Sequence, residues 1–334
     1  MLATEPSQFD VGQVRLAVFV GCILAALAGA YVLRRRGWLK AEWSKPIMSG
    51  SIIVCDAPVA LLSIWHLRIL EGVWKVPVAG GVVTVAACLV GLGLARIRRM
   101  APADGSVFGL QSGMGNVGYT LGGSLCFAIW GLQGLALEQM YCLMWPFVAF
   151  LFCFPLARHY GERARGRQPT AGPDVAYAVR TLLRSIADIR SLPLYTAALG
   201  LVLNLRGVAP PAAIERWHVI DALMVLGIVS QFGGVGMTVY ARRLPAFWKP
   251  SAGTAAVKFL VSPALMVLVA CLLGLEGVPL AVCVLLAAMP SALYSVLMAN
   301  LFGLNRDLAN ATFLLTHALC LAIVAVVAVV YLVT

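Results

Sequence analysis

Apolar residues fill this chain in long runs that are separated by short polar stretches. Each run approaches the roughly 20 residues that an α-helix needs to cross a bilayer. We therefore expect ten transmembrane helices, at residues 14–33, 47–65, 76–94, 107–130, 135–156, 192–205, 219–240, 257–273, 279–302 and 309–333. The one long polar connection divides the chain into a first five-helix unit (1–157), a linker (158–191) and a second five-helix unit (192–334).

The linker is rich in arginine and is interrupted by the Pro/Gly-containing stretch 168–173. Residues 175–189 after that stretch are amphipathic, with Val179, Leu182, Leu183 and Ile186 at helical spacing. This pattern predicts a helix that lies on the membrane surface.

The fourth expected helix is unusual because it combines glycine with polar side chains. Residues 111–131 have the sequence QSGMGNVGYTLGGSLCFAIWG, and five of their glycines fall within residues 113–123. Glycine in a helix interior costs about 0.5–1 kcal/mol relative to alanine. A bilayer tolerates broken backbone only where it is buried in protein or lines a cavity. We therefore expect an interrupted helix here.

The ninth expected helix, in the second half, has a similar interruption. Residues 287–300, AAMPSALYSVLMAN, are broken by Pro290 and carry serine and asparagine. Paired interrupted helices in corresponding halves are typical of transporter substrate sites. The alternative is two kinked helices whose glycines only allow close packing. The candidate substrate-binding residues are Asn116, Gln111, Ser112, Thr120, Pro290, Ser291 and Ser295, and the candidate crossover residues are Gly115, Gly118, Gly122, Gly123 and Pro290.

Composition supports an integral membrane protein. The chain is 61% hydrophobic and 12% charged, about half the charged fraction of an average soluble domain. Its nine cysteines lie mostly in apolar runs, where they behave as small hydrophobes. They form no CxxC motif and no Cys/His cluster with metal-ligand spacing, so we expect neither a metal site nor a cofactor.

The distribution of basic residues predicts the topology. If the first helix enters the cytoplasm at Arg34, all Lys and Arg except five fall on the cytoplasmic side, that is 20 of 25. The five exceptions are Arg15, Arg68, Lys75, Arg206 and Arg216. The positive-inside rule then places both termini outside. The same distribution explains the net charge of +11 by membrane topology and contact with anionic lipids, and we expect no nucleic-acid partner.

Two units of five helices each must cross the membrane in opposite senses. If they share a fold they form an inverted repeat, and the fourth helix of each unit is the interrupted one. The expected fold class is therefore an all-α integral membrane protein of ten helices in two inverted five-helix repeats, with helices four and nine broken.

Four stretches resemble the auxin efflux carrier family of membrane transporters, a branch of the bile acid/sodium symporter-like superfamily. They are GAYVLRRRGWLKAEWSKPIMSGSIIVCDAP (29–58), GNVGYTLGG (115–123), LPLYTAALGLVLNLRGVAPP (192–211) and AAMPSALYSVLMANLFGLNRDLAN (287–310). Two family prolines are absent: Gly123 stands nearest to the one after the helix-four asparagine, and residues 231–234 replace the one in helix seven.

The resemblance implies a homodimer of elevator-type carriers for small organic anions such as auxin-like and dicarboxylic acids. Helices three to five and eight to ten would form the mobile part. The expected location, a plasma membrane of the bacterial inner-membrane type, rests instead on the topology, the arginine-rich inner loops and the lack of a targeting segment. Residues 1–13 lack the basic start of a cleaved signal peptide.

Three further side chains carry more than one interpretation. Asn116 can contact substrate or only cap a half-helix. Asp56 lies in the second helix two residues before Pro58, and it can couple proton movement to transport or only accept hydrogen bonds that the proline leaves free. His317 can relay protons or pack as a neutral ring. Lys258 is expected to extend to the inner headgroups.

These features favour a secondary carrier over four other classes. No GxxxxGK[ST] motif occurs, which argues against ATP hydrolysis by this chain. An enzyme would need convergent acid/base groups or metal ligands, whereas His66, Glu71 and Asp104 are scattered. A channel, or a sensor or scaffold that kept the carrier fold without transport, stays as an alternative.

Overall fold

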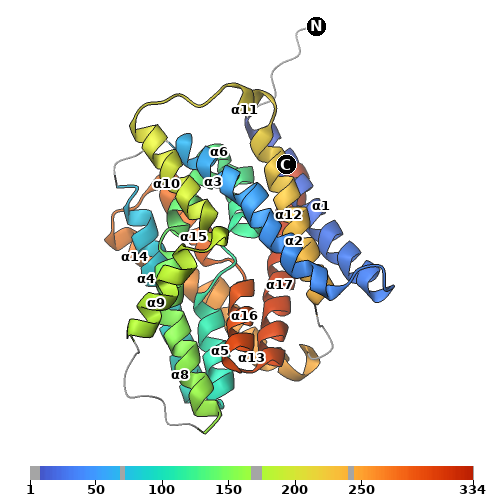
Figure 1. Ribbon diagram of the computed structural model, residues 1–334, viewed down its shortest axis with the longest axis vertical. Coiled ribbons are helices and arrows are strands. Elements are labelled where there is room, and N and C mark those ends of the chain that lie inside the picture. Colours follow the sequence, from blue (N-terminus) through green and yellow to red (C-terminus); the bar gives the residue numbers. More distant parts are fainter. Residues whose placement is uncertain (1–7, 68–71, 167–174, 240–243, 334) are drawn as a thin grey trace.

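The regular structure is helical throughout the described residues, which are 8–67, 72–166, 175–239 and 244–333 of the computed structural model (Figure 1). The helices stand roughly side by side along the long axis of the molecule. Among the described residues one isolated antiparallel bridge occurs, between Gly115 and Ser291. The Pro/Gly stretch 168–173 of the linker and residues 68–71 and 240–243 lie outside these ranges.

The first helices follow the hydrophobic runs closely. Helix α1 (Gln8–Arg35) is continuous, and the second span is built from α2 (Ser44–Ser51), η2 (Ile52–Asp56) and α3 (Ala57–Trp65). Helix α4 (Lys75–Ile97) is the third span. The segment η2 is a π turn, which carries one more residue per turn than an α-helix and often occurs at functional sites.

The fourth span is interrupted as the glycines predict. Helix α5 (Pro102–Gly113) ends, residues 114–118 have no helical structure, and the chain resumes in a second π turn, η3 (Tyr119–Gly123), followed by α6 (Ser124–Cys142). Helix α6 is a hairpin of two helices, because Gly131 has φ 60° and ψ −148°. Gly131 thus separates the two helices that the sequence predicts at 107–130 and 135–156.

Contacts across α6 confirm that the chain reverses at Gly131. A Cβ on Gly134 would lie 2.8 Å from Cβ of Trp130 and even closer to the carbonyl oxygen of Cys126, eight residues earlier. A Cβ on Gly123 would lie 3.0 Å from Oε2 of Glu138. Residues so far apart in sequence meet only in an antiparallel pair, since one helix would separate them by more than about 10 Å.

The fifth span descends from this hairpin, and the chain then returns upward through a bent pair of helices. The descending part contains α7 (Trp145–Val148), η4 (Ala149–Cys153) and α8 (Phe154–Ala164). Helix α9 (Val175–Ile186) meets the helix made of η5 (Ile189–Ser191) and α10 (Leu192–Leu205) at 75°. The expected amphipathic helix is present: Leu182 is buried, whereas Val179 and Leu183 are exposed.

The second half continues with long helices and one more interruption. After the short α11 (Ala213–Arg216), α12 (Val219–Thr238) descends and α13 (Leu244–Ala256), η7 (Val257–Val261) and α14 (Ser262–Leu272) ascend. Helices α15 (Gly277–Ala287) and α16 (Leu293–Phe302) are the two parts of the interrupted segment, and α17 (Arg306–Val333) follows.

The start of the eighth helix differs from the sequence prediction. Hydropathy predicts a start at residue 257, whereas the helix begins at Leu244. The additional turns are rich in small and polar residues because α13 packs on α17 inside the protein. Ser251 and Thr254 are fully buried, and Oγ of Ser251 lies 3.0 Å from Oγ1 of Thr312.

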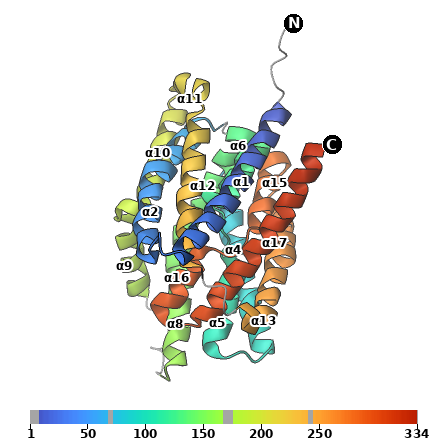
Figure 2. The ribbon, with the colours of Figure 1, turned by 90° about the vertical axis from the view of Figure 1, so that its right-hand side faces the viewer.

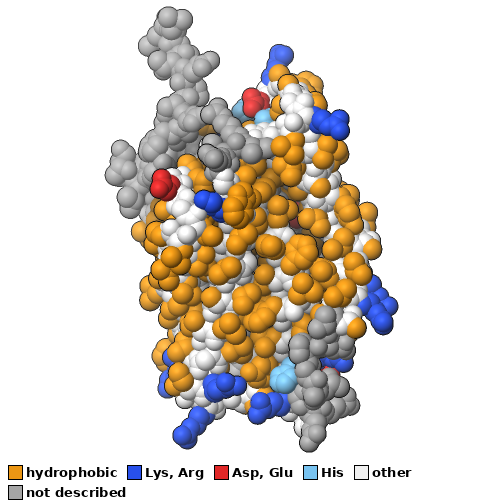
Figure 3. All heavy atoms as spheres, turned by 90° about the vertical axis from the view of Figure 1, so that its left-hand side faces the viewer, with side chains coloured by type: hydrophobic (Ala, Val, Ile, Leu, Met, Phe, Trp, Pro, Cys, Tyr) orange, Lys and Arg blue, Asp and Glu red, His pale blue; other side chains and the backbone are white. Residues whose placement is uncertain are grey.

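Seven helices in the described residues are long and apolar enough to cross a membrane. They are Val11–Arg35, Ala41–Trp65, Lys75–Ile97, Leu121–Ala164, Val219–Thr238, Leu244–Leu272 and Arg306–Val327. Hydrophobic side chains cover the middle of the face in Figure 3, and Lys and Arg side chains stand mainly near its two ends. Helix α1 begins and α17 ends toward the same end of the molecule (Figure 2). These features define a multi-pass membrane protein with an all-helical fold.

The helices pack in two groups. In the first, α1 and α2 lie against α12, and α3 lies against α10; Nε and Nη2 of Arg15 donate to the Asp221 carboxylate at 2.6 and 3.1 Å. In the second, α5 packs on α4 and α8, α13 packs on α17, and α14 packs on α4 and α15. The two interrupted segments both belong to this second group.

The hairpin at Gly131 generates the first prediction. We expect Gly134→Ala to lower the melting temperature by several degrees, because the new methyl group would overpack against Cys126 and Trp130 at about 1–3 kcal/mol. Gly93→Ala in α4 is the matched control, since a Cβ there has no other atom within 4 Å. Thermal unfolding in detergent, followed by tryptophan fluorescence, measures both. Equal melting temperatures for the two variants would contradict the close helix contact.

Candidate functional site

The two helix interruptions meet at the centre of the protein. The backbone N–H of Asn116 donates to the carbonyl oxygen of Pro290 at 2.7 Å, and the N–H of Ala292 donates to that of Met114 at 2.9 Å. These two bonds make the antiparallel bridge between Gly115 and Ser291. Each interruption thereby supplies hydrogen-bond partners to the other, which satisfies backbone groups that hydrocarbon would leave unpaired.

Side chains behind this crossing hold it in place. Oγ of Ser291 donates to the Gln111 carbonyl oxygen at 3.1 Å, and Nε2 of Gln111 donates to Oγ of Ser295 at 3.2 Å and to the Ala309 carbonyl oxygen at 2.9 Å. Oγ of Ser112 and Oγ of Ser295 bond back to their own helices, as short hydroxyls in membrane helices often do. All four side chains are buried behind the crossing.

A cavity of about 360 Å³ lies on the open side of the crossing. Residues 115–119 of the first interruption and residues 292–294 of the second line it, together with the start of the fifth span and the corner between α9 and α10. Among the candidate residues, Asn116, Gly115, Gly118 and Asp56 face this cavity. Gly122 and Gly123 lie in η3 above it, and the side chain of Thr120 lies outside what the structure describes.

Two helix N-termini face the cavity from opposite directions. The helix after the first interruption begins at Tyr119, and α16 begins at Leu293; both residues line the cavity. The first N–H groups of a helix have no partner inside the helix and carry the positive end of its dipole. Both N-termini therefore direct a positive partial charge toward the cavity.

Asn116 is connected to His317 of α17. Nδ1 of His317 donates to the Phe313 carbonyl oxygen at 2.8 Å, so the neutral ring presents an acceptor at Nε2. Nδ2 of Asn116 lies 3.1 Å from that Nε2 and donates to it. The structure thus brings together two candidates that are 201 residues apart, and the hydrogen bond fixes the orientation of the Asn116 amide at the cavity.

Asp56 is bonded to a residue that the sequence analysis did not connect with it. Nε2 of Gln231 in α12 donates to both carboxylate oxygens of Asp56, at 3.0 and 2.9 Å. Gln231 is the first of the four residues that stand in place of the family's helix-seven proline. The carboxyl group of Asp56 is buried and lines the cavity from the π turn η2.

Glu138 is a second buried carboxyl group at the cavity, and the sequence analysis missed it. It is fully buried, it accepts from Nε2 of Gln139, and Sγ of Cys142 donates to it at 3.0 Å. The hydroxyl of Tyr119 donates to Oε1 of Gln139, which links this group to the first interruption. The pair Glu138-Gln139 inside an apolar run is the sequence pattern that indicates this buried carboxyl group.

Lys258 does not extend to the headgroups as expected. Because the helix begins at Leu244, Lys258 lies in the middle of the span, within the π turn η7, and is 1% exposed. Its Nζ donates to the Gly113 carbonyl oxygen at 3.2 Å. It faces a cavity of about 20 Å³, the size of one water molecule, which Ser262 also lines. Within the described residues no acidic side chain pairs with it.

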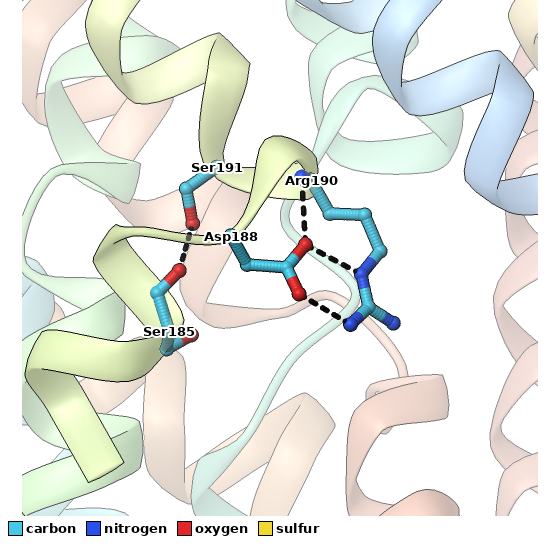
Figure 4. A network of polar contacts seen from close by, with 4 residues as sticks. All are labelled: Ser185, Asp188, Arg190 and Ser191. Carbon is cyan, nitrogen blue, oxygen red and sulfur yellow. Dashed lines mark hydrogen bonds and ion pairs between the residues drawn. The ribbon is translucent and has the colours of Figure 1, made fainter. Parts of the chain in front are cut away.

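The corner between α9 and α10 completes the cavity (Figure 4). The Asp188 carboxylate accepts from the backbone N–H of Arg190 at 2.8 Å and from its Nε and Nη2 at 2.7 and 2.6 Å. Oγ of Ser191 donates to the Ser185 carbonyl oxygen at 2.6 Å. The Arg190 hydrogen bonds hold the pKa of Asp188 well below its usual range and raise the pKa of Arg190.

The arrangement defines a class of protein: a membrane protein with a cavity at the crossing of two interrupted helices, lined mostly by apolar residues and by a few polar and charged side chains. Residues 179–328 match the model of the family described as membrane transport protein, which is the auxin efflux carrier family. No curated protein matches the chain. The match confirms the family resemblance, and it is to a family of transporters rather than of enzymes. In the described residues no cluster of three His, Cys, Asp or Glu side chains is placed to hold a metal.

The burial of Lys258 generates the second prediction. We expect Lys258→Met to leave the melting temperature unchanged or raise it, because a desolvated ammonium bonded to one carbonyl oxygen is replaced by an apolar chain of similar length. Lys258→Ala is the control and should lower it, since it leaves a void costing about 2–5 kcal/mol. If Lys258→Met unfolds as early as Lys258→Ala, the ammonium stabilises the fold and the expectation is wrong.

Proposed function

We propose that the protein is a secondary transporter that carries small organic anions across the membrane by alternating access. The observation that carries this proposal is the cavity of about 360 Å³ at which two helix N-termini, the Asn116 amide and Arg190 meet. Each of these groups attracts a carboxylate. The family match supports transport as the activity.

The proposed architecture is ten spans in two inverted five-helix repeats. In support, α5 and the helix after it ascend in Figure 1, whereas α15 and α16 descend. The hairpin at Gly131 divides the long apolar segment Leu121–Ala164 into the end of one span and the whole of the next. The second packing group, which contains both interruptions, would be the mobile part of an elevator mechanism.

Coupling to protons is part of the proposal. Asp56 and Glu138 line the cavity that would hold the anion. If both were ionised they would repel a carboxylate at short range, and the repulsion is strong where water is scarce. Protonation of one or both removes this repulsion, which would link anion binding to proton uptake. His317 would take part through Asn116.

The remaining parts of the proposal rest on the resemblance and on charge. We place the protein in a plasma membrane as a homodimer with both termini outside, because the basic residues would then face the cytoplasm and its anionic lipids. Labelling of single introduced cysteines from each side of the membrane tests the orientation.

Asn116→Ala tests the site. We expect it to lower kcat/KM for saturable anion uptake into proteoliposomes by about tenfold or more, because an amide that orients the substrate is lost and the His317 acceptor is left unpaired. Asn300→Ala is the matched control, since the Asn300 amide bonds back to Val296 and does not line the cavity. Linear, non-saturating flux would indicate a channel. Folded protein that moves no anion in a panel of organic acids would favour a sensor or scaffold.

Asp56→Asn and Glu138→Gln test coupling. Each variant keeps an oxygen that can accept the neighbouring glutamine amide but cannot exchange a proton. We expect uptake driven by a pH gradient to fall to the rate without a gradient, while exchange of labelled for unlabelled substrate persists. Retained stimulation by the gradient in both variants would exclude these two groups as the coupling site. Asp56→Leu does not distinguish proton coupling from a structural role, because it also removes the hydrogen bond to Gln231.

A further inference from the structure

The corner between α9 and α10 contributes the one cationic side chain that lines the large cavity in the described structure. Arg190 is at this corner, and the other charged groups on the cavity wall are the carboxyls of Asp56 and Glu138. Lys258 faces the small cavity behind the crossing instead. An anion inside the large cavity therefore has Arg190 as its nearest guanidinium partner.

Arg190 is already engaged with an anion of the chain itself. Its Nε and Nη2 form a bidentate pair with the Asp188 carboxylate, and the two side chains are 52% and 31% exposed. Its Nη1 has no hydrogen-bond partner in the described part of the chain, so the guanidinium can reach a second acceptor. A half-exposed ion pair contributes little to stability, so an exchange of its partner requires little free energy.

Arg190 and Asn116 belong to different packing groups. Helix α10, which follows Arg190, lies against α3, whereas Asn116 is bonded to α17 and to the second interruption. A substrate that contacts both side chains would bridge the two groups. When the two packing groups move relative to each other, the substrate would leave the Arg190 guanidinium, which would then lack an anionic partner.

We propose that Arg190 binds the acidic group of the substrate after its ion pair with Asp188 breaks. The ion pair between Arg190 and Asp188 forms again when the substrate leaves. Arg190 is then a specificity-determining residue, which requires an anion, and Asp188 is its internal substitute for that anion. This inference rests on the proposed function and adds the residue that recognises the charge. The exchange transfers no atoms; it replaces one carboxylate by another on Nε and Nη2.

A purely structural role makes a different prediction. Asp188 is also the N-cap of η5, because it accepts from the backbone N–H of Arg190. If the pair only shaped the corner, removing either member would weaken substrate binding to a similar extent. Asp188→Asn separates the two roles, since asparagine caps a helix as well as aspartate does but carries no charge.

The test compares Arg190→Gln, Asp188→Asn and the double variant in proteoliposome uptake. We expect Arg190→Gln to raise KM about ten- to hundredfold, as a charge-assisted bond is lost. Asp188→Asn should lower KM about two- to tenfold and also lower kcat, because the freed guanidinium releases its anion more slowly. The double variant should behave like Arg190→Gln. Arg184→Gln is the control, because Arg184 is an exposed cation of the preceding helix α9 and does not line the cavity.

Opposite changes of KM in the two single variants support the exchange, and changes in the same direction overturn it. An unchanged KM in Arg190→Gln also overturns it.

A binding measurement separates this inference from the proposed function. Stabilisation of the detergent-purified protein by acetate, succinate or phenylacetate is measured as a shift of melting temperature. If no acid stabilises the wild type and none is transported, the proposed function and this inference both fail. If an acid binds the wild type and Arg190→Gln equally well, this inference alone fails.

Discussion

Two backbone hydrogen bonds at the crossing of the interrupted helices support the rest of the structure. Each interruption exposes N–H and carbonyl groups at a depth where water cannot satisfy them. The bonds between Asn116 and Pro290 and between Ala292 and Met114 pair groups of one interruption with groups of the other. Each half of the chain thus satisfies backbone groups of the other half. The two bonds hold the interruptions against each other at the wall of the cavity.

The buried ionisable side chains around the crossing form hydrogen bonds with amides and carbonyls rather than ion pairs with opposite charges. Gln231 donates to Asp56, Gln139 donates to Glu138, and the Gly113 carbonyl accepts from Lys258. An amide satisfies the geometry of a carboxyl group in either protonation state, whereas a buried cation would hold it ionised. Such surroundings leave the charge of the cavity free to change without a rearrangement of the helices.

The sequence predicts features that depend on local composition better than contacts between distant parts of the chain. The bounds of the helix predicted at 192–205 are correct to the residue. Both interruptions are located, because glycine, proline and asparagine inside an apolar run weaken a helix directly and locally. The early start at Leu244 was missed because buried serine and threonine replace apolar residues there. The partners of Asp56 and Asn116 lie 175 and 201 residues away, and no local pattern encodes such contacts. The sequence does not distinguish Arg190 from the other arginines of the linker. Its place on the cavity wall depends on the 75° bend between α9 and the helix that begins at Ile189.

The π turns have a consequence for how this chain can change over evolution. Each behaves as an α-helix into which one residue has been inserted, and η2, η3 and η7 carry Asp56, Tyr119 and Lys258. Deleting one residue from such a turn would restore an ordinary helix and leave the two ends of the span in nearly the same relative orientation, because the wider turn absorbs the extra residue. The same deletion from a regular α-helix would rotate the two ends by about 100°. Changes of length by one residue are therefore a route, beside substitution, by which the side chains at these three turns can change while the rest of the span keeps its packing.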